Sequence, residues 1–62
     1  MKKLFIGDII QATDYIKGPG MVICPGTIGK VSYIDTLGTA IIKWGNGLIS
    51  ALNPQISAYS II

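Results

Sequence analysis

The chain of 62 residues is half hydrophobic and only 13% charged, with five basic residues, three acidic residues and a formal net charge of +2. A chain this short is expected to form one domain, residues 1–62, at the lower limit of what folds alone. Because it has no histidine and one cysteine, the composition excludes a structural zinc site and an internal disulfide.

The amino-terminal residues do not read as a secretory signal. Residues 1–5 are a short basic start, either a flexible arm or the approach to a first strand. The apolar run stops at Gly7 and Asp8, short of the ~7 to 15 residues that a signal peptide needs. The last 19 residues lack charge, but they hold polar side chains that a bilayer core penalises. We expect a cytoplasmic protein without a membrane segment, whose first strand follows Gly7 and ends at Ala12.

Residues 13–26 form a long connection that contains two prolines. Its apolar run, residues 21–24, is too short for a helix. Long loops are uncommon in compact domains and are often functional. Two interpretations stay open: a lid over one end of a barrel, or a binding loop that carries Tyr15, Lys17 and Met21.

Residues 25–52 predict three consecutive strands joined by two short turns. Asn46 and Gly47 lie between apolar runs and predict a two-residue hairpin loop, in which both residues adopt positive φ. Asp35 and Gly38 predict a type I turn followed by a bulge, because aspartate bonds to the backbone two residues on and glycine accepts a left-handed conformation. The two turns therefore predict a three-stranded meander.

The side chains of this meander divide between two faces. Alternate residues of its middle strand share one face and are expected to form core: Ala40, Ile42 and Trp44. Ile41 then points outward. Val31 and Ile34 are both apolar but are three residues apart, so in a regular strand they would point to opposite faces. The strand that precedes the first turn is therefore expected to bend or bulge.

The end of the chain predicts a kink and one more strand. Pro54 has no amide donor for a central strand, so residues 52–55 are expected to form a single helical turn or a kink. Residues 56–62 then supply a closing strand with Tyr59 and Ile61 on one face. The whole chain is expected to be all-β: a small five-stranded SH3-like barrel with a long first loop and a short helical turn before the last strand.

Three runs, PGTIGKV, IDTLGTAIIKW and NGLISALNP, resemble a family of short uncharacterised SH3-like domains of Gram-positive bacteria, phages and mobile elements. The usual pattern of that family is PGTxGxVxxVDDxGxxxVxWDNGxxLxLxP. The matching residues are Pro25, Gly26, Thr27, Gly29, Val31, Asp35, Gly38, Trp44, Asn46, Gly47, Leu52 and Pro54. The chain departs from the pattern at Thr36 and Gly45, where acids are usual, and at Ser50, where an inward leucine is usual. The resemblance implies the barrel fold and no particular activity.

The composition leaves little for catalysis. Histidine, glutamate and arginine are absent, and the three aspartates precede or occupy turns, where they are expected to cap the backbone. Cys24 has no histidine to activate it and is expected to be buried and inert. No phosphate-binding glycine motif occurs. We expect no enzymatic activity, no cofactor, no metal and no small-molecule substrate.

Protein binding is the leading functional hypothesis. The apolar fraction is high for so short a chain, and apolar surface usually marks an interface. We expect a homo-oligomer or a protein partner, for instance a host or viral protein that the chain inhibits. Outward Ile41 and Ile49 add to the apolar loop, and the expected contact residues are Tyr15, Met21, Val22 and Ile41.

Nucleic-acid binding is the alternative. Small barrels often bind nucleic-acid strands through a basic face with exposed aromatic side chains. Lys30 and Lys43 fall on neighbouring strands and, with Tyr33, are expected to line such a face. The missing arginine and the low net charge disfavour this alternative. A groove for proline-rich peptides is disfavoured too, because the first loop is not acidic and Trp44 is expected to face inward.

Overall fold

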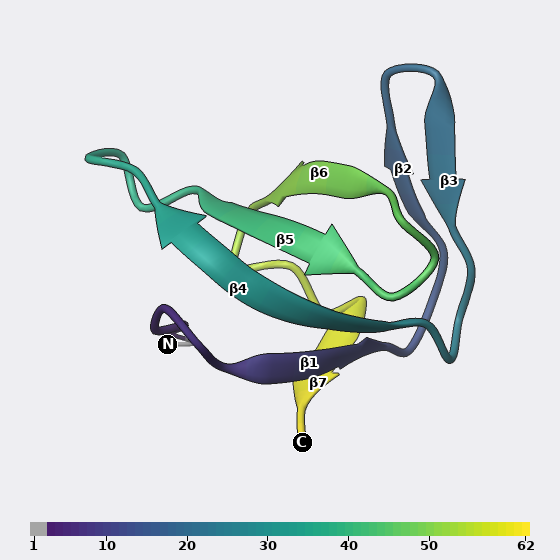
Figure 1. Ribbon diagram of the computed structural model, residues 1–62, viewed down its shortest axis with the longest axis horizontal. Helices are drawn as coiled ribbons and strands as arrows, with labels where there is room; N and C mark the ends of the chain where they lie inside the picture. Colours follow the sequence, from purple (N-terminus) through teal and green to yellow (C-terminus); the bar gives the residue numbers. More distant parts are fainter. Residues whose placement is uncertain (1–2) are drawn as a thin grey trace.

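The computed structural model describes residues 3–62, and every regular element in them is a strand (Figure 1). The strands are β1 (Ile9–Ala12), β2 (Ile16–Gly18), β3 (Met21–Ile23), β4 (Ile28–Ile34), β5 (Ala40–Trp44), β6 (Ile49–Leu52) and β7 (Tyr59–Ile61). The expected all-β class is therefore confirmed. No helix of the described residues is long and apolar enough to cross a bilayer.

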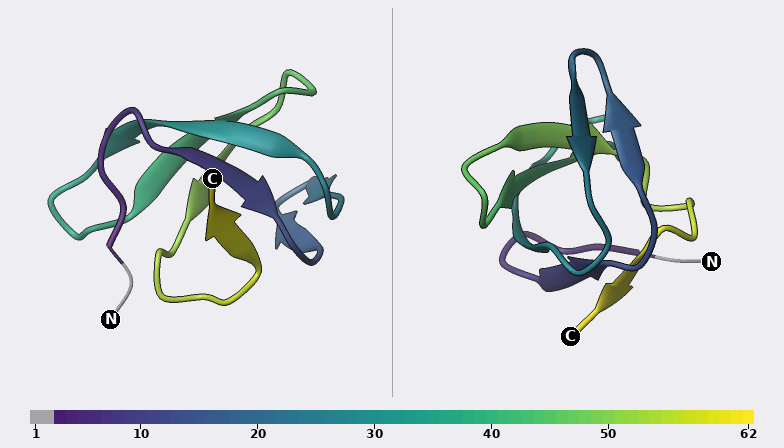
Figure 2. Two further views of the ribbon diagram at one scale, coloured as in Figure 1. Left: turned by 90° about the horizontal axis from the view of Figure 1, so that it is seen from below. Right: turned by 90° about the vertical axis from the view of Figure 1, so that its right-hand side faces the viewer.

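Five of the strands form one curved antiparallel sheet in the order β6-β5-β4-β1-β7 (Figure 2). The first strand lies between β4 and the last strand, β7, although β7 is far from it in sequence. Strands β6 and β7 are the two edges, so the sheet curls without closing on itself.

The long connection is a β-hairpin, which the sequence did not predict. Strands β2 and β3 pair with each other and project beyond the main sheet (Figure 1). Ile16 and Ile23 lie opposite each other and are buried in the core, so one face of the hairpin covers the core as a lid would. Strands of three residues are too short to show a clear alternation in sequence. Cys24, just beyond β3, is exposed, and the expectation that it is buried was wrong.

Both turns of the meander have the same hydrogen-bond pattern. Gly38 N–H donates to Asp35 O at 3.0 Å, and Gly47 N–H donates to Trp44 O at 3.0 Å. Both glycines have positive φ, 86° and 90°. The first turn is as predicted. The second is not a two-residue loop, because Trp44 N–H donates to Leu48 O at 2.8 Å and residues 45–47 lie between them. Asn46 does not have positive φ, and its side chain accepts the N–H of Leu48 at 3.0 Å.

The predicted core of the meander is confirmed. Ala40, Ile42 and Trp44 are buried, and the register between β4 and β5 shifts between Val31 and Tyr33. This β-bulge is the irregularity that the parity of the strand required. Because of it, Val31 is fully buried and Ile34 packs against the same core.

Gly29 lies opposite Trp44 on the inner face of the sheet. A Cβ atom at position 29 would come within 2.6 Å of both Ile42 Cγ2 and Trp44 Cε3. No side chain fits at that distance. The indole ring therefore requires glycine on the neighbouring strand.

The last segment differs from the prediction in two ways. Residues 53–56 form a hydrogen-bonded turn, in which Asn53 O accepts from Ile56 and Asn53 Oδ1 accepts from Gln55, and no helical turn is seen. The asparagine side chain bonds to the backbone locally and competes with helix formation. Tyr59 is buried and donates its hydroxyl to Pro54 O at 2.6 Å, whereas Ile61 is exposed near the end of the edge strand.

The amino-terminal arm is part of the fold from Leu4 onward. Leu4 is buried in the core, and Phe5 N–H bonds to Asp8 Oδ2 at 2.9 Å. Met1 and Lys2, which the sequence also assigns to an arm, lie outside the described residues.

Candidate functional site

The outer face of the main sheet carries two cross-strand rows of side chains. In the first row, four strands contribute one residue each: Ile9, Lys30, Lys43 and Ile49. In the second, Tyr33 lies opposite Ile41, and Ile41 lies opposite Ala51. These rows contain residues that the sequence assigned to two different functions. Ile41 was expected to contact a protein, whereas Lys30, Tyr33 and Lys43 were expected to contact nucleic acid.

Lys30 and Lys43 are direct cross-strand partners, and both are exposed. Their other partners in the row are Ile9 and Ile49, so neither lysine has an acidic neighbour across the ladder. Like charges directly opposite each other destabilise a sheet. The pair therefore opposes folding unless an anion neutralises it.

The three carboxylates lie outside the strands, and each accepts a backbone N–H close to it in the chain. No strand contains an acidic residue. Asp14 Oδ1 accepts the N–H of Tyr15 at 2.7 Å, and Asp35 Oδ1 accepts the N–H groups of Leu37 and Thr39, both at 2.9 Å. The expectation that these acids cap turns is confirmed. The strands carry only positive charge.

Tyr33 is brought to the outer face by the β-bulge. It is three residues after Lys30, so in a regular strand the two side chains would point to opposite faces. The shift between Val31 and Tyr33 restores Tyr33 to the face of Lys30. The Tyr33 side chain is 56% exposed.

A hollow of about 450 Å³ lies beside the two lysines. Its lining is Ile6, Gly7, Lys30, Val31, Ser32 and Lys43. Gly7 N–H donates to Val31 O at 2.8 Å, which holds the turn before β1 against β4. The sequence analysis missed this hollow because its two walls are far apart in the chain.

The expected contact residues of the hairpin lie on two different sides of it. Val22 is 46% exposed and pairs with Lys17, on the hairpin face opposite Ile16 and Ile23. Tyr15 is 59% exposed. Met21 is partly buried and pairs with Gly18.

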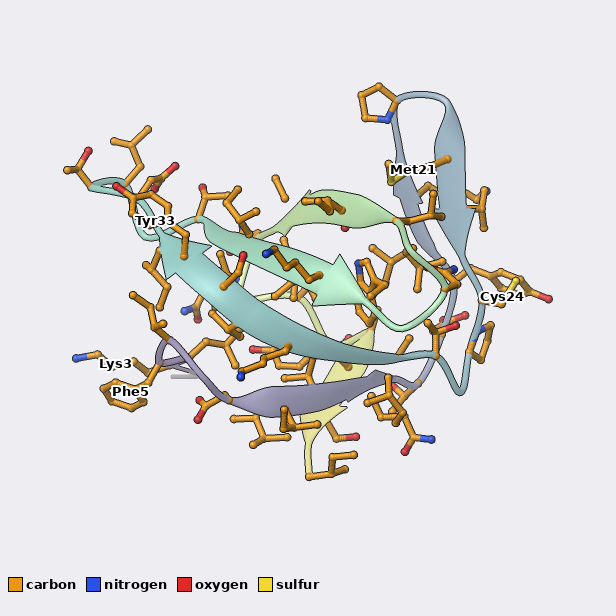
Figure 3. The ribbon with its side chains drawn as sticks, viewed as in Figure 1. Lys3, Phe5, Met21, Cys24 and Tyr33 are labelled. Atoms are coloured by element: carbon orange, nitrogen blue, oxygen red, sulfur yellow. The ribbon has the colours of Figure 1, made fainter. Side chains whose placement is uncertain are left out.

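Met21 borders a second hollow, of about 370 Å³, between the hairpin and the edge strand β6. Ile49 and Ala51 line its other side. Tyr33 lies near the end of β4, on the opposite side of the view from Met21 on the hairpin (Figure 3). The hairpin and the sheet face are therefore two regions of one surface, joined by β6.

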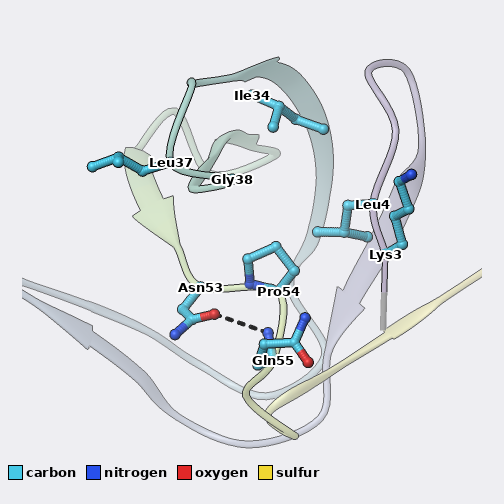
Figure 4. Close-up of a pocket in the computed structure, with 8 residues that line it drawn as sticks. All are labelled: Lys3, Leu4, Ile34, Leu37, Gly38, Asn53, Pro54 and Gln55. Atoms are coloured by element: carbon cyan, nitrogen blue, oxygen red, sulfur yellow. Dashed lines mark hydrogen bonds between the residues drawn. The ribbon is translucent and has the colours of Figure 1, made fainter. Parts of the chain in front are cut away.

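A third hollow, of about 480 Å³, was not predicted from the sequence (Figure 4). It lies among three segments that are distant in the chain, and its lining is Lys3, Leu4, Ile34, Leu37, Gly38, Asn53, Pro54 and Gln55. The close-up shows Leu4, Ile34 and Pro54 around the opening. None of the lining side chains is acidic or nucleophilic, apart from the amine of Lys3.

One titratable side chain, Tyr59, lies in the core. Burial raises the pKa of the Tyr59 phenol above its ordinary value of 10.0. Tyr59 belongs to the core rather than to any of the three hollows. Within residues 3–62, no three histidine, cysteine, aspartate or glutamate side chains gather as a metal site would require.

Comparison with known proteins adds no further assignment. No protein-family model, no curated protein and no solved structure matches this chain.

Proposed function

We propose that this protein is a non-enzymatic binding module that contacts another protein or a second copy of itself through apolar surface. One observation carries the proposal. Among the described residues, eleven large apolar side chains are exposed, and the buried core also has eleven residues. The exposed residues are Phe5, Ile6, Ile9, Tyr15, Val22, Ile28, Tyr33, Leu37, Ile49, Ile61 and Ile62. Exposed apolar patches on soluble domains usually mark interaction sites.

The proposed contact residues lie in two regions, the hairpin and the outer face of the sheet, with the edge strand β6 between them. They include Tyr15, Met21 and Val22 from the hairpin and Ile41 from β5, with Ile49 between them. Val22 and Ile49 are the most useful reporters, because both are exposed and neither belongs to the core cluster. An interface of this kind needs a small number of buried anchors surrounded by polar groups.

An SH3-like barrel is our proposal for the fold. Its support is the strand order, in which a three-stranded meander follows β1 and the last strand returns to the free side of β1. The resemblance to short SH3-like domains of Gram-positive bacteria and phages suggests a cytoplasmic protein of mobile-element type. An inhibitor of a host or viral protein is one role that such a module serves.

The test is the mass in solution, measured by light scattering behind a sizing column at low and high salt. We expect an oligomer that salt does not dissociate, since apolar contacts are not screened. Val22→Asp and Ile49→Asp should each lower the mass, while Leu37→Asp is the matched control, because Leu37 is 90% exposed but lies in a turn outside the proposed surface. A monomer that also fails to bind an apolar dye would contradict the proposal.

Nucleic-acid binding is the second candidate function, and one observation favours it. Lys30 and Lys43 are cross-strand partners without an acidic neighbour, and Tyr33 shares their face. Lys30→Glu combined with Lys43→Glu should abolish a salt-sensitive complex and leave the fold intact. If the wild type forms no complex at low salt, this candidate is wrong.

A further inference from the structure

We propose that the hollow beside Lys30 and Lys43 binds a backbone phosphate of single-stranded nucleic acid, with Tyr33 stacking against one base. The inference rests on the second candidate function and adds to it the binding position, the strand type and the basis of selectivity. Its support is the charge of the two lysines, the hydrogen bonds of the hollow and the exposure of the Tyr33 ring.

The charge of the site favours an anion. Two lysines face each other across β4 and β5, and no strand supplies an acid. A phosphate between the two ammonium groups would replace a repulsion with two attractions. Because lysine is a compact point charge rather than a planar fork, the pair suits a phosphate group more than a base edge.

Several hydrogen-bond donors around the hollow are already paired within the protein, so they are not free to bind a base edge. The Ser32 hydroxyl donates to Ile41 O at 3.1 Å, so its proton is already committed. Gly7 N–H is committed to Val31 O, and Val31 N–H donates to Asp8 O at 2.9 Å. The two lysines are therefore the donors that a ligand would meet, and the contact should be independent of sequence.

Tyr33 decides between a single strand and a duplex. Its ring is more than half exposed, and it lies opposite Ile41, whose side chain is partly buried. A tyrosine beside a β-branched neighbour is a stable cross-strand pair and so a firm platform. Bases in a duplex are covered on both faces by their neighbours, so the ring can stack only on an unpaired base.

The direct test is fluorescence anisotropy with a labelled oligothymidylate of about 12 nucleotides. The wild type should bind at low salt and weaken as salt rises. Lys30→Gln and Lys43→Gln should each reduce the slope of log K against log salt by about 0.7. Lys17→Gln is the matched control, because Lys17 is an exposed strand lysine on the hairpin, and it should leave the slope unchanged.

A second pair of variants tests the stacking. Tyr33→Leu should weaken the oligothymidylate complex about tenfold and leave the complex with an abasic strand of equal length unchanged. Tyr15→Leu removes a ring of similar exposure on the hairpin and should alter neither complex. Unchanged Trp44 fluorescence would show that every variant is folded.

The contrary outcomes separate the two levels of the inference. If Lys17→Gln reduces the salt slope as much as Lys30→Gln or Lys43→Gln does, the proposed binding position beside Lys30 and Lys43 is wrong, while nucleic-acid binding stands. If no strand binds at low salt, nucleic-acid binding itself is wrong. If a duplex binds as tightly as the single strand, the base-stacking role of Tyr33 is wrong. If polyglutamate of equal charge competes equally well, the ligand is not specifically a nucleic acid.

Discussion

Trp44 donates its indole N–H to Ser50 Oγ at 2.8 Å across the β5–β6 ladder. Trp44 is only 3% exposed, so the hydroxyl satisfies a donor that water cannot reach. The pattern that the sequence resembles usually has leucine at position 50. The structure shows that this serine has a specific partner in the core.

Replacing that acceptor should destabilise the domain. Ser50→Ala leaves the buried N–H of Trp44 without its partner, which should lower the free energy of unfolding by about 1 to 3 kcal/mol. The measurement is urea denaturation followed by the fluorescence of the single tryptophan. Ser57→Ala is the control, because Ser57 is exposed, and it should change the free energy by less than about 0.5 kcal/mol.

Gly29→Ala should destabilise the domain by overpacking. The new Cβ would lie 2.6 Å from Ile42 Cγ2 and Trp44 Cε3, and relieving that overlap should cost about 1 to 3 kcal/mol. Gly18→Ala is matched to it as a strand glycine without positive φ, and its Cβ would meet only the flexible Met21 side chain, Cγ at 3.4 Å and Sδ at 3.8 Å. If both variants show the same urea midpoint as the wild type, the close packing of the indole ring on β4 is incorrect.

Trp44→Ala should unfold the domain. Losing a buried tryptophan costs about 3 to 5 kcal/mol, which equals the whole stability expected for so small a core. Amide resonances in a two-dimensional NMR spectrum would collapse into the range of an unfolded chain. Trp44→Phe keeps a ring on Gly29 and should stay folded, and a folded Trp44→Ala variant would show that the core tolerates the cavity.

Tyr59 should make the domain sensitive to alkali. Burial raises the pKa of its phenol in the folded state, so between 10.0 and that higher value the unfolded chain loses the proton first. Stability is therefore fully present below pH 10.0 and falls as pH rises through the folded pKa. Tyr59→Phe should lower the free energy of unfolding at neutral pH by about 0.5 to 1.5 kcal/mol, because it removes the hydrogen bond to Pro54 O.

The comparison of wild type and Tyr59→Phe isolates this residue. Every other side chain is common to the two proteins, so its contribution cancels in the difference of the two unfolding free energies. That difference should shrink as the pH rises above 10.0. A constant difference would contradict the assignment to Tyr59.

Cys24 should react in the native state. Its side chain is exposed beyond β3, so a thiol reagent should modify it without unfolding. The measurement is the release of a coloured thiolate from a disulfide reagent, with and without denaturant. Cys24→Ser provides the blank, and a reaction that requires denaturant would mean that the thiol is buried.

The meander of β4, β5 and β6 was predictable because its signals act over short distances. Alternating apolar residues fixed the inward faces of Ala40, Ile42 and Trp44, and turn residues marked both reversals. Even the bulge in β4 followed from the opposite parity of Val31 and Ile34. The detailed geometry at Asn46 did not follow, since the same residue pair suits more than one turn.

The remaining features depend on residues that are far apart in the chain. The return of β7 to β1 and the burial of Ile16 and Ile23 arise from pairing and packing between distant segments. The candidate site is of the same kind. The sequence placed Lys30 and Lys43 on neighbouring strands, but only the register of the folded sheet makes them direct partners, and only the bulge turns Tyr33 to their face. Pairing register follows from the hydrophobic pattern together with the turn geometry, and a bulge shifts it by one residue, so the cross-strand partners are settled only when the strands pack with one face in the core.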